Sequence, residues 1–281
     1  MIESPISSRS VERWVPVANI GDVCAFVDEL ERGVAGELVF SAEGTSGIAF
    51  VENARICWAA ASGFARRLTE LLVEKSGVDA TTMEGLFRTC KAERVPLGEY
   101  LVGRGIVSAA DLRSALVVHT VESLGRLTGH GHRAAWIPRA RGGYNPRFTF
   151  GTAEIVTLAA SRADAALAAI ARAELVRNFT DADWGAAFIR SQASAVPMPI
   201  ALCGDAPSSV DALGRVAKWA ASALDMVGAW GGDDPLIAVT QPRGPVLVAF
   251  RHADMVIAGE TTAFGPARML NRRAQARRTR G

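Results

Sequence analysis

The segment GHGHRA (129–134) has the residue spacing of a loop that cradles a dinucleotide pyrophosphate. Such a loop works when a strand precedes it and a helix begins after it, because the amides at the start of that helix hold the phosphates. Here a helical pattern precedes the segment, and a stretch containing Trp136 and Pro138 follows it. We therefore expect no nucleotide cofactor at this place and interpret the segment as a loop.

Two further groups of residues are candidates for chemistry, and both have unsuitable neighbours. His130 and His132 have no cysteine or carboxylate close in the sequence, whereas a metal site needs three or four protein ligands. Asp233 and Asp234 stand in GGDDP, which is typical of a turn between a helix and a strand. The sequence thus predicts no metal, no cofactor and no catalytic residue, and we expect a protein that is not an enzyme.

Charge and composition argue against several classes of partner. The chain has 281 residues, and its 31 basic and 29 acidic side chains give a formal net charge of +2. That balance is atypical of proteins that bind nucleic acid or membrane surfaces. Arginines gather near the C-terminus, but no aromatic residue follows Phe264 to stack on bases. We expect no nucleic-acid binding, because arginines at the end of a last helix also complement its dipole.

The cysteines and the N-terminus indicate the compartment. The four cysteines lie far apart in apolar surroundings and form no CxxC pair: Cys24, Cys57, Cys90 and Cys203. Buried free thiols are typical of a reducing compartment. The polar N-terminus lacks the apolar run of a signal peptide, and no window is long and apolar enough for a membrane span. We therefore expect a cytoplasmic protein with no membrane association.

The N-terminal half is predicted to form an antiparallel three-stranded meander with a helical insert. The predicted strands are 37–41, 47–51 and 55–60, separated by turn-forming residues. The predicted helices are 15–32, 64–75 and a helical unit over 82–127 that is broken near Pro96 and Gly105. Within this unit, Ser108 with Asp111 three residues later predicts a capped helix start. A stretch rich in glycine, arginine and histidine runs over 125–147. A short strand over 148–150 is predicted to return to the meander.

The C-terminal half is predicted to contain, in order, helix, two strands, helix, three strands and helix. The predicted helices are 153–176, 209–230 and 264–278. The predicted strands are 184–190, 197–203, 236–240, 245–250 and 255–260. These strands are almost continuously apolar, which predicts one antiparallel sheet with helices on both faces. The fold class we expect is therefore α+β, with domains over 1–161 and 162–281.

The helix predicted at 209–230 has two apolar stripes at a spacing of about 100° per residue. One stripe is enough to seat a helix on a sheet. The second stripe consists of Trp219, Ala223, Met226 and Trp230. Either another part of the chain covers this stripe, or it is a subunit interface, because tryptophan and methionine are enriched in interface cores.

The segment from about Arg162 to Arg278 resembles the roadblock family of dynein light chains and bacterial GTPase regulators. The resemblance rests on the order of elements, on the strands PVLVAF (245–250) and ADMVIAGET (253–261), and on the helix after Phe264-Gly265. It implies a homodimer formed by the central helix and an adjacent strand edge, and in some members a complex with a Ras-like small GTPase. It implies no catalytic residues.

The segment from about Val15 to Ser161 resembles the PATAN family, found in bacterial response-regulator proteins. The resemblance rests on GELVFSAEGTSGIAFVENARICWAA (36–60), with Gly36, Gly47 and Ala59-Ala60 at matching places. Asn53-Ala54 stands at a turn where that family usually has glycine, and asparagine also tolerates positive φ. The resemblance implies an interaction module.

The stretch PLGEYLVGRGIVSAADLRSALVVH (96–119) is similar to the N-terminal motif of type II secretion and pilus ATPases, some of which bind cyclic di-GMP. The chain retains Leu97, Gly98 and Gly105, but has Pro96 in place of arginine and His119 in place of glutamine. The retained residues are those that two packed helices and a tight turn require. Loss of the guanidinium removes the best partner for guanine or phosphate.

Two functions follow from these patterns and resemblances. The first is a non-enzymatic bacterial signalling adaptor or scaffold, which forms a homodimer and regulates a small GTPase. The alternative is a sensor that binds a cyclic dinucleotide through residues 96–119, with Leu97, Gly98, Gly105 and His119 as candidate contacts.

Overall fold

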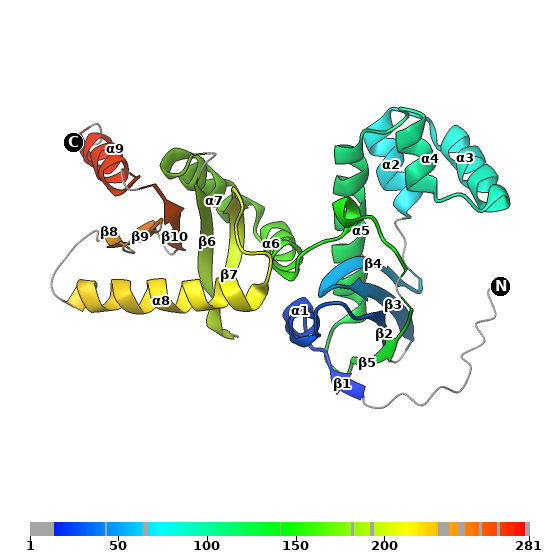
Figure 1. Ribbon diagram of the computed structural model, residues 1–281, viewed down its shortest axis with the longest axis horizontal. Helices are drawn as coiled ribbons and strands as arrows, with labels where there is room; N and C mark the ends of the chain where they lie inside the picture. The colour runs from blue at the N-terminus through cyan, green and yellow to red at the C-terminus, as the bar shows by residue number, and fades with distance from the viewer. Residues whose placement is uncertain are drawn as a thin grey trace. The chain divides into compact units, whose positions relative to one another are not determined.

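The computed structural model describes most of the chain as two compact units, Met1–Phe150 and Gly151–Gly281 (Figure 1). The described residues are 14–42, 44–63, 67–140, 142–180, 183–191, 194–229, 236–240, 245–252, 255–262 and 265–278, and within them the side chains of 190, 191, 194–196, 228, 229 and 273–278 are not described. The boundary between the units falls before the helix at 152–163, whereas the sequence placed the boundary after Ser161.

The first unit contains one antiparallel sheet of five strands. In spatial order they are β1 (Trp14–Pro16), β5 (Arg133–Pro138), β2 (Ala35–Ala42), β3 (Thr45–Glu52) and β4 (Arg55–Ala61). The strands β2, β3 and β4 form the predicted meander. Strand β5 was not predicted from the sequence, and it lies between β1 and β2. Local composition favoured a loop there, but pairing on both sides makes a strand.

The first helix is shorter than the predicted 15–32. Helix α1 (Ile20–Glu29) begins after Asn19, whose side chain accepts a hydrogen bond from the Asp22 amide, while Asp22 accepts one from the Asn19 amide. This reciprocal cap fixes the start of the helix. Residues 14–16 instead pair with β5. The predicted strand over 148–150 is a 3-10 turn, η1 (Pro146–Phe148), followed by a single bridge between Phe150 and Ile56.

The helical insert consists of α2 (Leu68–Ser76), α3 (Ala80–Glu93), α4 (Leu97–Gly103) and α5 (Ala109–Leu127). The breaks predicted near Pro96 and Gly105 are present. Ser108 begins α5 by accepting a hydrogen bond from the Asp111 amide at 3.0 Å, which confirms the predicted cap. The start of α5 shares a buried cluster with α2, α3 and α4, and α5 also packs against β4.

The second unit also contains a five-stranded antiparallel sheet. Its strands in spatial order are β7 (Ser194–Cys203), β6 (Trp184–Ser191), β10 (Met255–Thr261), β9 (Val246–His252) and β8 (Leu236–Thr240). Its helices are α6 (Thr152–Ala163), α7 (Ala165–Asn178), α8 (Val210–Ala229) and α9 (Gly265–Arg278). The mixed α/β class expected from the sequence is confirmed. The single helix predicted over 153–176 is two helices, because Asp164 ends α6 and its side chain caps α7.

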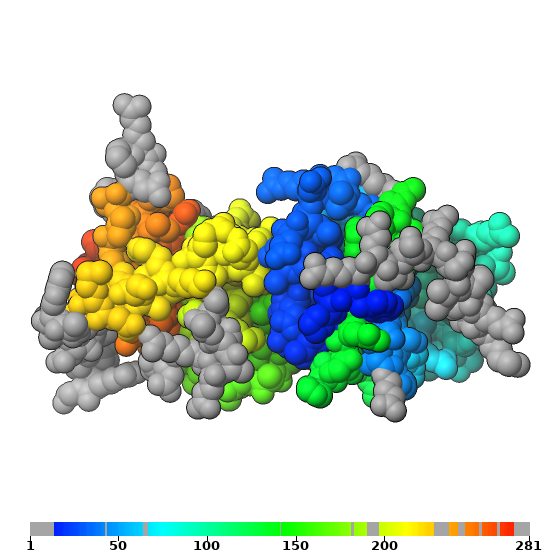
Figure 2. Space-filling model, turned by 90° about the horizontal axis from the view of Figure 1, so that it is seen from below, coloured from blue at the N-terminus to red at the C-terminus, as the bar shows by residue number. Residues whose placement is uncertain are grey.

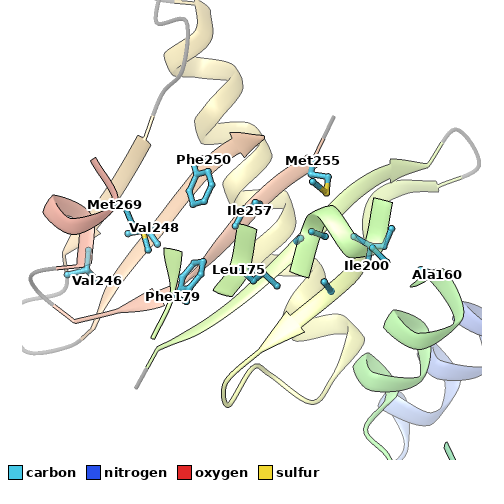
Figure 3. Close-up of a cluster of buried hydrophobic side chains, with 14 residues drawn as sticks. Ala160, Leu175, Phe179, Ile200, Val246, Val248, Phe250, Met255, Ile257 and Met269 are labelled. Carbon is cyan, nitrogen blue, oxygen red and sulfur yellow. The ribbon is translucent and has the colours of Figure 1, made fainter. Parts of the chain in front are cut away.

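Helices pack on both faces of this second sheet. On one face, Leu175 of α7 and Met269 of α9 share a buried cluster with Val248, Phe250 and other residues of the sheet (Figure 3). On the other face, α8 packs against alternate residues of the same strands. Successive side chains of a strand point to opposite faces, so strands covered on both sides are apolar throughout.

No helix in the described part of the chain combines the length and the apolar character needed to cross a membrane.

Two glycines give opposite predictions for replacement by alanine. At Gly259 in β10, a Cβ would lie 2.1 Å from the Trp184 carbonyl oxygen and 2.7 Å from the Phe179 ring. We expect Gly259→Ala to lower the free energy of unfolding of the second unit by about 1–3 kcal/mol through overpacking. At Gly85 in α3 no heavy atom lies within 4 Å of the added Cβ, so Gly85→Ala should stabilise the first unit by about 0.5–1 kcal/mol.

Urea unfolding followed by circular dichroism measures both changes. An unchanged midpoint for Gly259→Ala would show that β10 and β6 can separate without cost, contrary to the close approach of Gly259 and Gly185.

Candidate protein-interaction surface

Helix α8 is fixed to the sheet by its first apolar stripe. Its N-terminus is held by Thr152, whose side chain accepts a hydrogen bond from the Val210 amide at 3.1 Å. The buried residues of this stripe are at most 1% exposed: Leu213, Ala217, Ala220 and Leu224. They pack against the sheet face formed by Ala186, Phe188, Ala249, Val256 and Ala258. Two of these four helix residues and three of these five sheet residues are alanines, so the helix lies close to the strands.

The second stripe of α8 is only partly covered by its own chain. Trp219 is half-buried and packs against the cluster beneath α8, and Ala223 is half-buried. Met226 is 57% exposed. Trp230 lies outside the described residues. Figure 2 shows α8, in yellow, at the surface of the second unit. Intramolecular cover therefore accounts for part of Trp219 and leaves Met226 in solvent.

Polar residues border this stripe. Lys218 and Ser222 are exposed on α8, and Asp225 forms an ion pair with Arg251 of β9. Asp225 and Arg251 therefore pair with each other within the same unit, beside the apolar stripe. An apolar centre with a polar rim is the usual composition of a protein-protein interface.

Strand β8 extends the apolar surface beyond α8. It packs against α8 and lies at one edge of the sheet, where no described strand pairs with its outer side. Its sequence, LIAVT, contains neither charge nor proline. Ala238, Val239 and Thr240 are exposed, and Val239 is 42% exposed. An apolar, uncharged edge strand of this kind readily pairs with another chain.

The opposite edge of the sheet is protected. Strand β7 contains Pro197 and Pro199, and α6 and α7 pack against it. Proline removes an amide donor, so it is tolerated at an edge and prevents pairing there. The two edges of one sheet are therefore built differently, and β8 is the edge that remains able to accept a strand.

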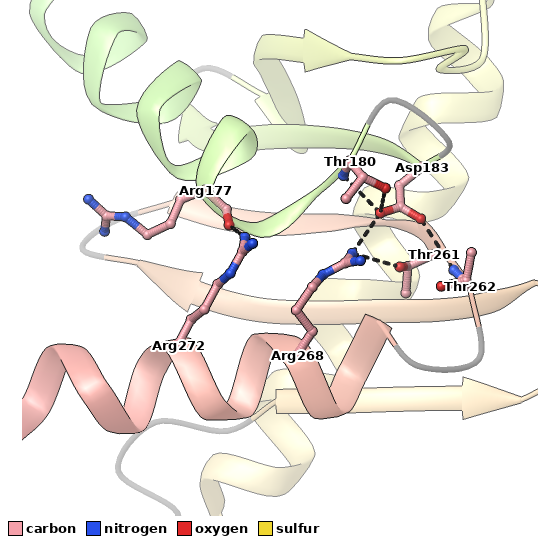
Figure 4. A network of polar contacts seen from close by, with 7 residues as sticks. All are labelled: Arg177, Thr180, Asp183, Thr261, Thr262, Arg268 and Arg272. Carbon is pink, nitrogen blue, oxygen red and sulfur yellow. Dashed lines mark hydrogen bonds and ion pairs between the residues drawn. The ribbon is translucent and has the colours of Figure 1, made fainter.

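A buried polar network in the second unit joins elements of the fold. The Asp183 carboxylate accepts hydrogen bonds from the Thr180 amide and hydroxyl, each at 2.8 Å, from the Thr262 amide at 3.2 Å and from Arg268 Nη2 at 2.8 Å (Figure 4). Burial opposes ionisation of this carboxyl group, but the hydrogen bonds outweigh burial and lower its pKa. Both carboxylate oxygens are occupied, so the group is suited to joining elements of the fold.

The four residues predicted as nucleotide contacts serve packing in the structure. Leu97 packs against the cluster of α2–α5, and a Cβ at Gly98 would lie 2.9 Å from Leu112 Cδ2. Gly105 adopts φ +66° in the turn before α5. His119 lies on the part of α5 that faces β4. Leu97 and Gly98 thus stand at the start of α4, Gly105 lies in the turn that follows α4, and His119 lies elsewhere, beside Trp58.

The ring of His119 is buried against the sheet. It is 7% exposed and stacks on Trp58 at 6.0 Å between ring centroids, with an interplanar angle of 10°. Burial lowers its pKa, and this effect is opposed by the Glu122 carboxylate and a hydrogen bond with the Ala59 backbone. The imidazole is therefore stabilised in its neutral form inside the fold.

The remaining candidates for chemistry have structural surroundings or lie outside the described residues. Burial raises the pKa of the Cys57 thiol to about 12 and that of Cys24 further, which disfavours the reactive thiolate. His132 lies in the turn that leads from α5 into β5. Asp233 and Asp234 lie outside the described residues. Among the described residues, no three His, Cys, Asp or Glu side chains are grouped so that they could hold a metal ion.

Comparisons of the chain with protein-family models, with curated proteins and with solved structures found no match. The candidate surface consequently depends on the geometry of α8 and β8. The sequence indicated the α8 stripe but not the β8 edge. The sequence of this strand, LIAVT (236–240), does show that it lacks charge and proline. Its position at the edge, however, follows only from the order of the strands in space.

Burial of His119 predicts a pH-dependent stability of the first unit. Because the folded-state pKa lies below the ordinary value of 6.5, the unfolded chain binds a proton more readily, and stability falls as pH drops through about 6.5. We expect His119→Gln to reduce this loss between about pH 7 and pH 5, as measured by urea unfolding.

The matched control is His130→Gln, which changes an exposed histidine near the end of α5. It should leave the pH dependence as in the original chain. An equal change in both variants would contradict a specific role for the buried ring.

Proposed function

We propose that this protein is a non-enzymatic signalling adaptor that acts by binding other proteins, and that its second unit forms a homodimer through α8 and β8. The exposure of Met226 (57%) and Val239 (42%) on two elements that pack together carries this proposal. Two adjoining apolar surfaces exposed to solvent favour association with another protein. Each large side chain that becomes buried contributes about 2 kcal/mol to the free energy of binding.

A second copy is the partner that the shape of this surface suits best. A two-fold axis would place the same helix and the same edge strand of each copy against each other, as most homodimers do. Antiparallel pairing of two β8 strands would satisfy the outer backbone groups of both edges. The stripe of Trp219, Ala223 and Met226 would then be covered by its equivalent in the partner.

The resemblance of the second unit to the roadblock family supports the same assignment and extends it. In that family the dimer serves as a scaffold, and several members regulate Ras-like small GTPases. We extend the proposal to a GTPase partner for the dimer, and to a separate protein partner for the first unit through its PATAN-like sheet. Two modules on one chain would raise the effective concentration of each bound partner near the other.

The alternative function, a cyclic-dinucleotide sensor, gains no support from the surroundings of its candidate residues. Leu97 and Gly98 face neighbouring helices, and the His119 ring is stacked against Trp58. A nucleotide site would instead require polar groups that converge on the base or the phosphates.

The dimer is tested by placing a charge on the exposed part of the surface. We expect the original chain to have the mass of a dimer in size-exclusion chromatography with light scattering. Met226→Glu should yield a monomer, because two carboxylates would be brought into an apolar contact. Trp219→Glu should act in the same way but would also disturb the cluster beneath α8, so Met226 is the cleaner site.

Val176→Glu is the matched control, because Val176 is 77% exposed on α7. It introduces the same charge at an exposed apolar residue on the other side of the sheet, and its mass should stay that of the dimer. A Met226→Glu variant that retains the dimer mass would exclude α8 as the interface.

A further inference from the structure

The described side chains of helix α9, residues 265–272, make a small apolar contact with the rest of the second unit. Its sequence, GPARMLNRRAQARR, contains two large apolar side chains, Met269 and Leu270. Met269 is completely buried, whereas Leu270 is 55% exposed. Helix α8, by comparison, buries a full stripe of side chains on the same sheet. Of the α9 side chains that the structure describes, Met269 alone supplies a large buried apolar contact.

Two arginines among the described side chains also attach α9. Arg268 Nη2 donates hydrogen bonds to the Asp183 carboxylate at 2.8 Å and to Thr261 Oγ1 at 3.5 Å. Arg272 donates to the backbone carbonyl of Arg177 at the end of α7. Figure 4 shows both arginines reaching from one side of α9 toward the sheet and α7. These contacts orient the helix, but water and ions can replace them when the helix moves away.

The start of α9 depends on close contact with β10. A Cβ at Gly265 would lie 2.0 Å from Thr261 Oγ1 and 2.3 Å from its Cγ2. Glycine is therefore needed for the helix to begin directly beside the strand. Over the described side chains of α9, residues 265–272, the attachment thus consists of one glycine contact, one buried methionine and two arginine anchors.

The surface beneath α9 is an apolar part of the sheet. Helix α9 packs against β8 and β9, and Met269 belongs to the cluster that includes Val246, Val248 and Phe250 (Figure 3). Separation of α9 would expose these side chains while α7 and α8 stay in place. It would also uncover one face of β8, the strand that forms the unprotected edge.

We propose that α9 is a releasable strap, which separates from the sheet by local unfolding while the rest of the second unit stays folded. Met269 and the pair of Arg268 with Asp183 set how often the strap opens. Opening uncovers Val246, Val248 and Phe250 as a second apolar surface, distinct from the α8 stripe. The strap thereby controls access to one face of β8, and this control does not depend on whether the protein forms a dimer.

Hydrogen-deuterium exchange of the full chain, followed by mass spectrometry, tests the strap directly. Amides of α9 should exchange about tenfold or more faster than those of the interior strands β6 and β10, because local opening costs less free energy than global unfolding. Met269→Ala should accelerate exchange in α9 by a further factor of about ten or more, with little change in β10.

Leu270→Ala is the matched control, since it removes a neighbouring, exposed side chain of similar size. It should change exchange in α9 by less than about twofold. Gly265→Ala should accelerate exchange in α9, because the added Cβ displaces the helix from Thr261. Equal exchange of α9 and β10 in the original chain would overturn the proposal, as would parallel acceleration of both segments in Met269→Ala.

Discussion

The main constraint on this protein is that some apolar residues of its second unit stay exposed to solvent. Both faces of the second sheet are covered, by α8 on one side and by α7 and α9 on the other. A sheet still has two edges, and of the two described edge strands β7 contains prolines whereas β8 contains none. The edge at β8 and the neighbouring side of α8 remain, with Met226 and Val239 in solvent.

This arrangement follows from how the strands are ordered. Strand β10 returns to pair with β6, so β8 is placed at the outside of the sheet although it lies in the middle of the unit's sequence. Gly185 and Gly259 form a pair across β6 and β10, beside the Phe179 ring. Close packing there leaves no room for side chains. The same order that buries β10 exposes β8, so the core and the candidate surface have one origin.

The sequence predicted the features that depend on local pattern. The start of α5 at Ser108, the breaks in the helical insert and the second stripe of α8 follow from capping residues, glycines and apolar spacing. The pairing of β5 with β1 and β2, the break at Asp164 and the edge position of β8 depend on contacts distant in the sequence. Leu97 and Gly98 match the residue types of a ligand-binding motif. In the structure, however, they pack against neighbouring helices.

The central claim is that a second copy of the chain covers α8 and β8. Sedimentation velocity of the unmodified protein over a wide dilution series tests it most directly. We expect a dimer at high concentration that dissociates reversibly to a folded monomer on dilution. A single monomeric species at every concentration, with native circular dichroism, would contradict it and would show that the exposed stripe and edge need no partner.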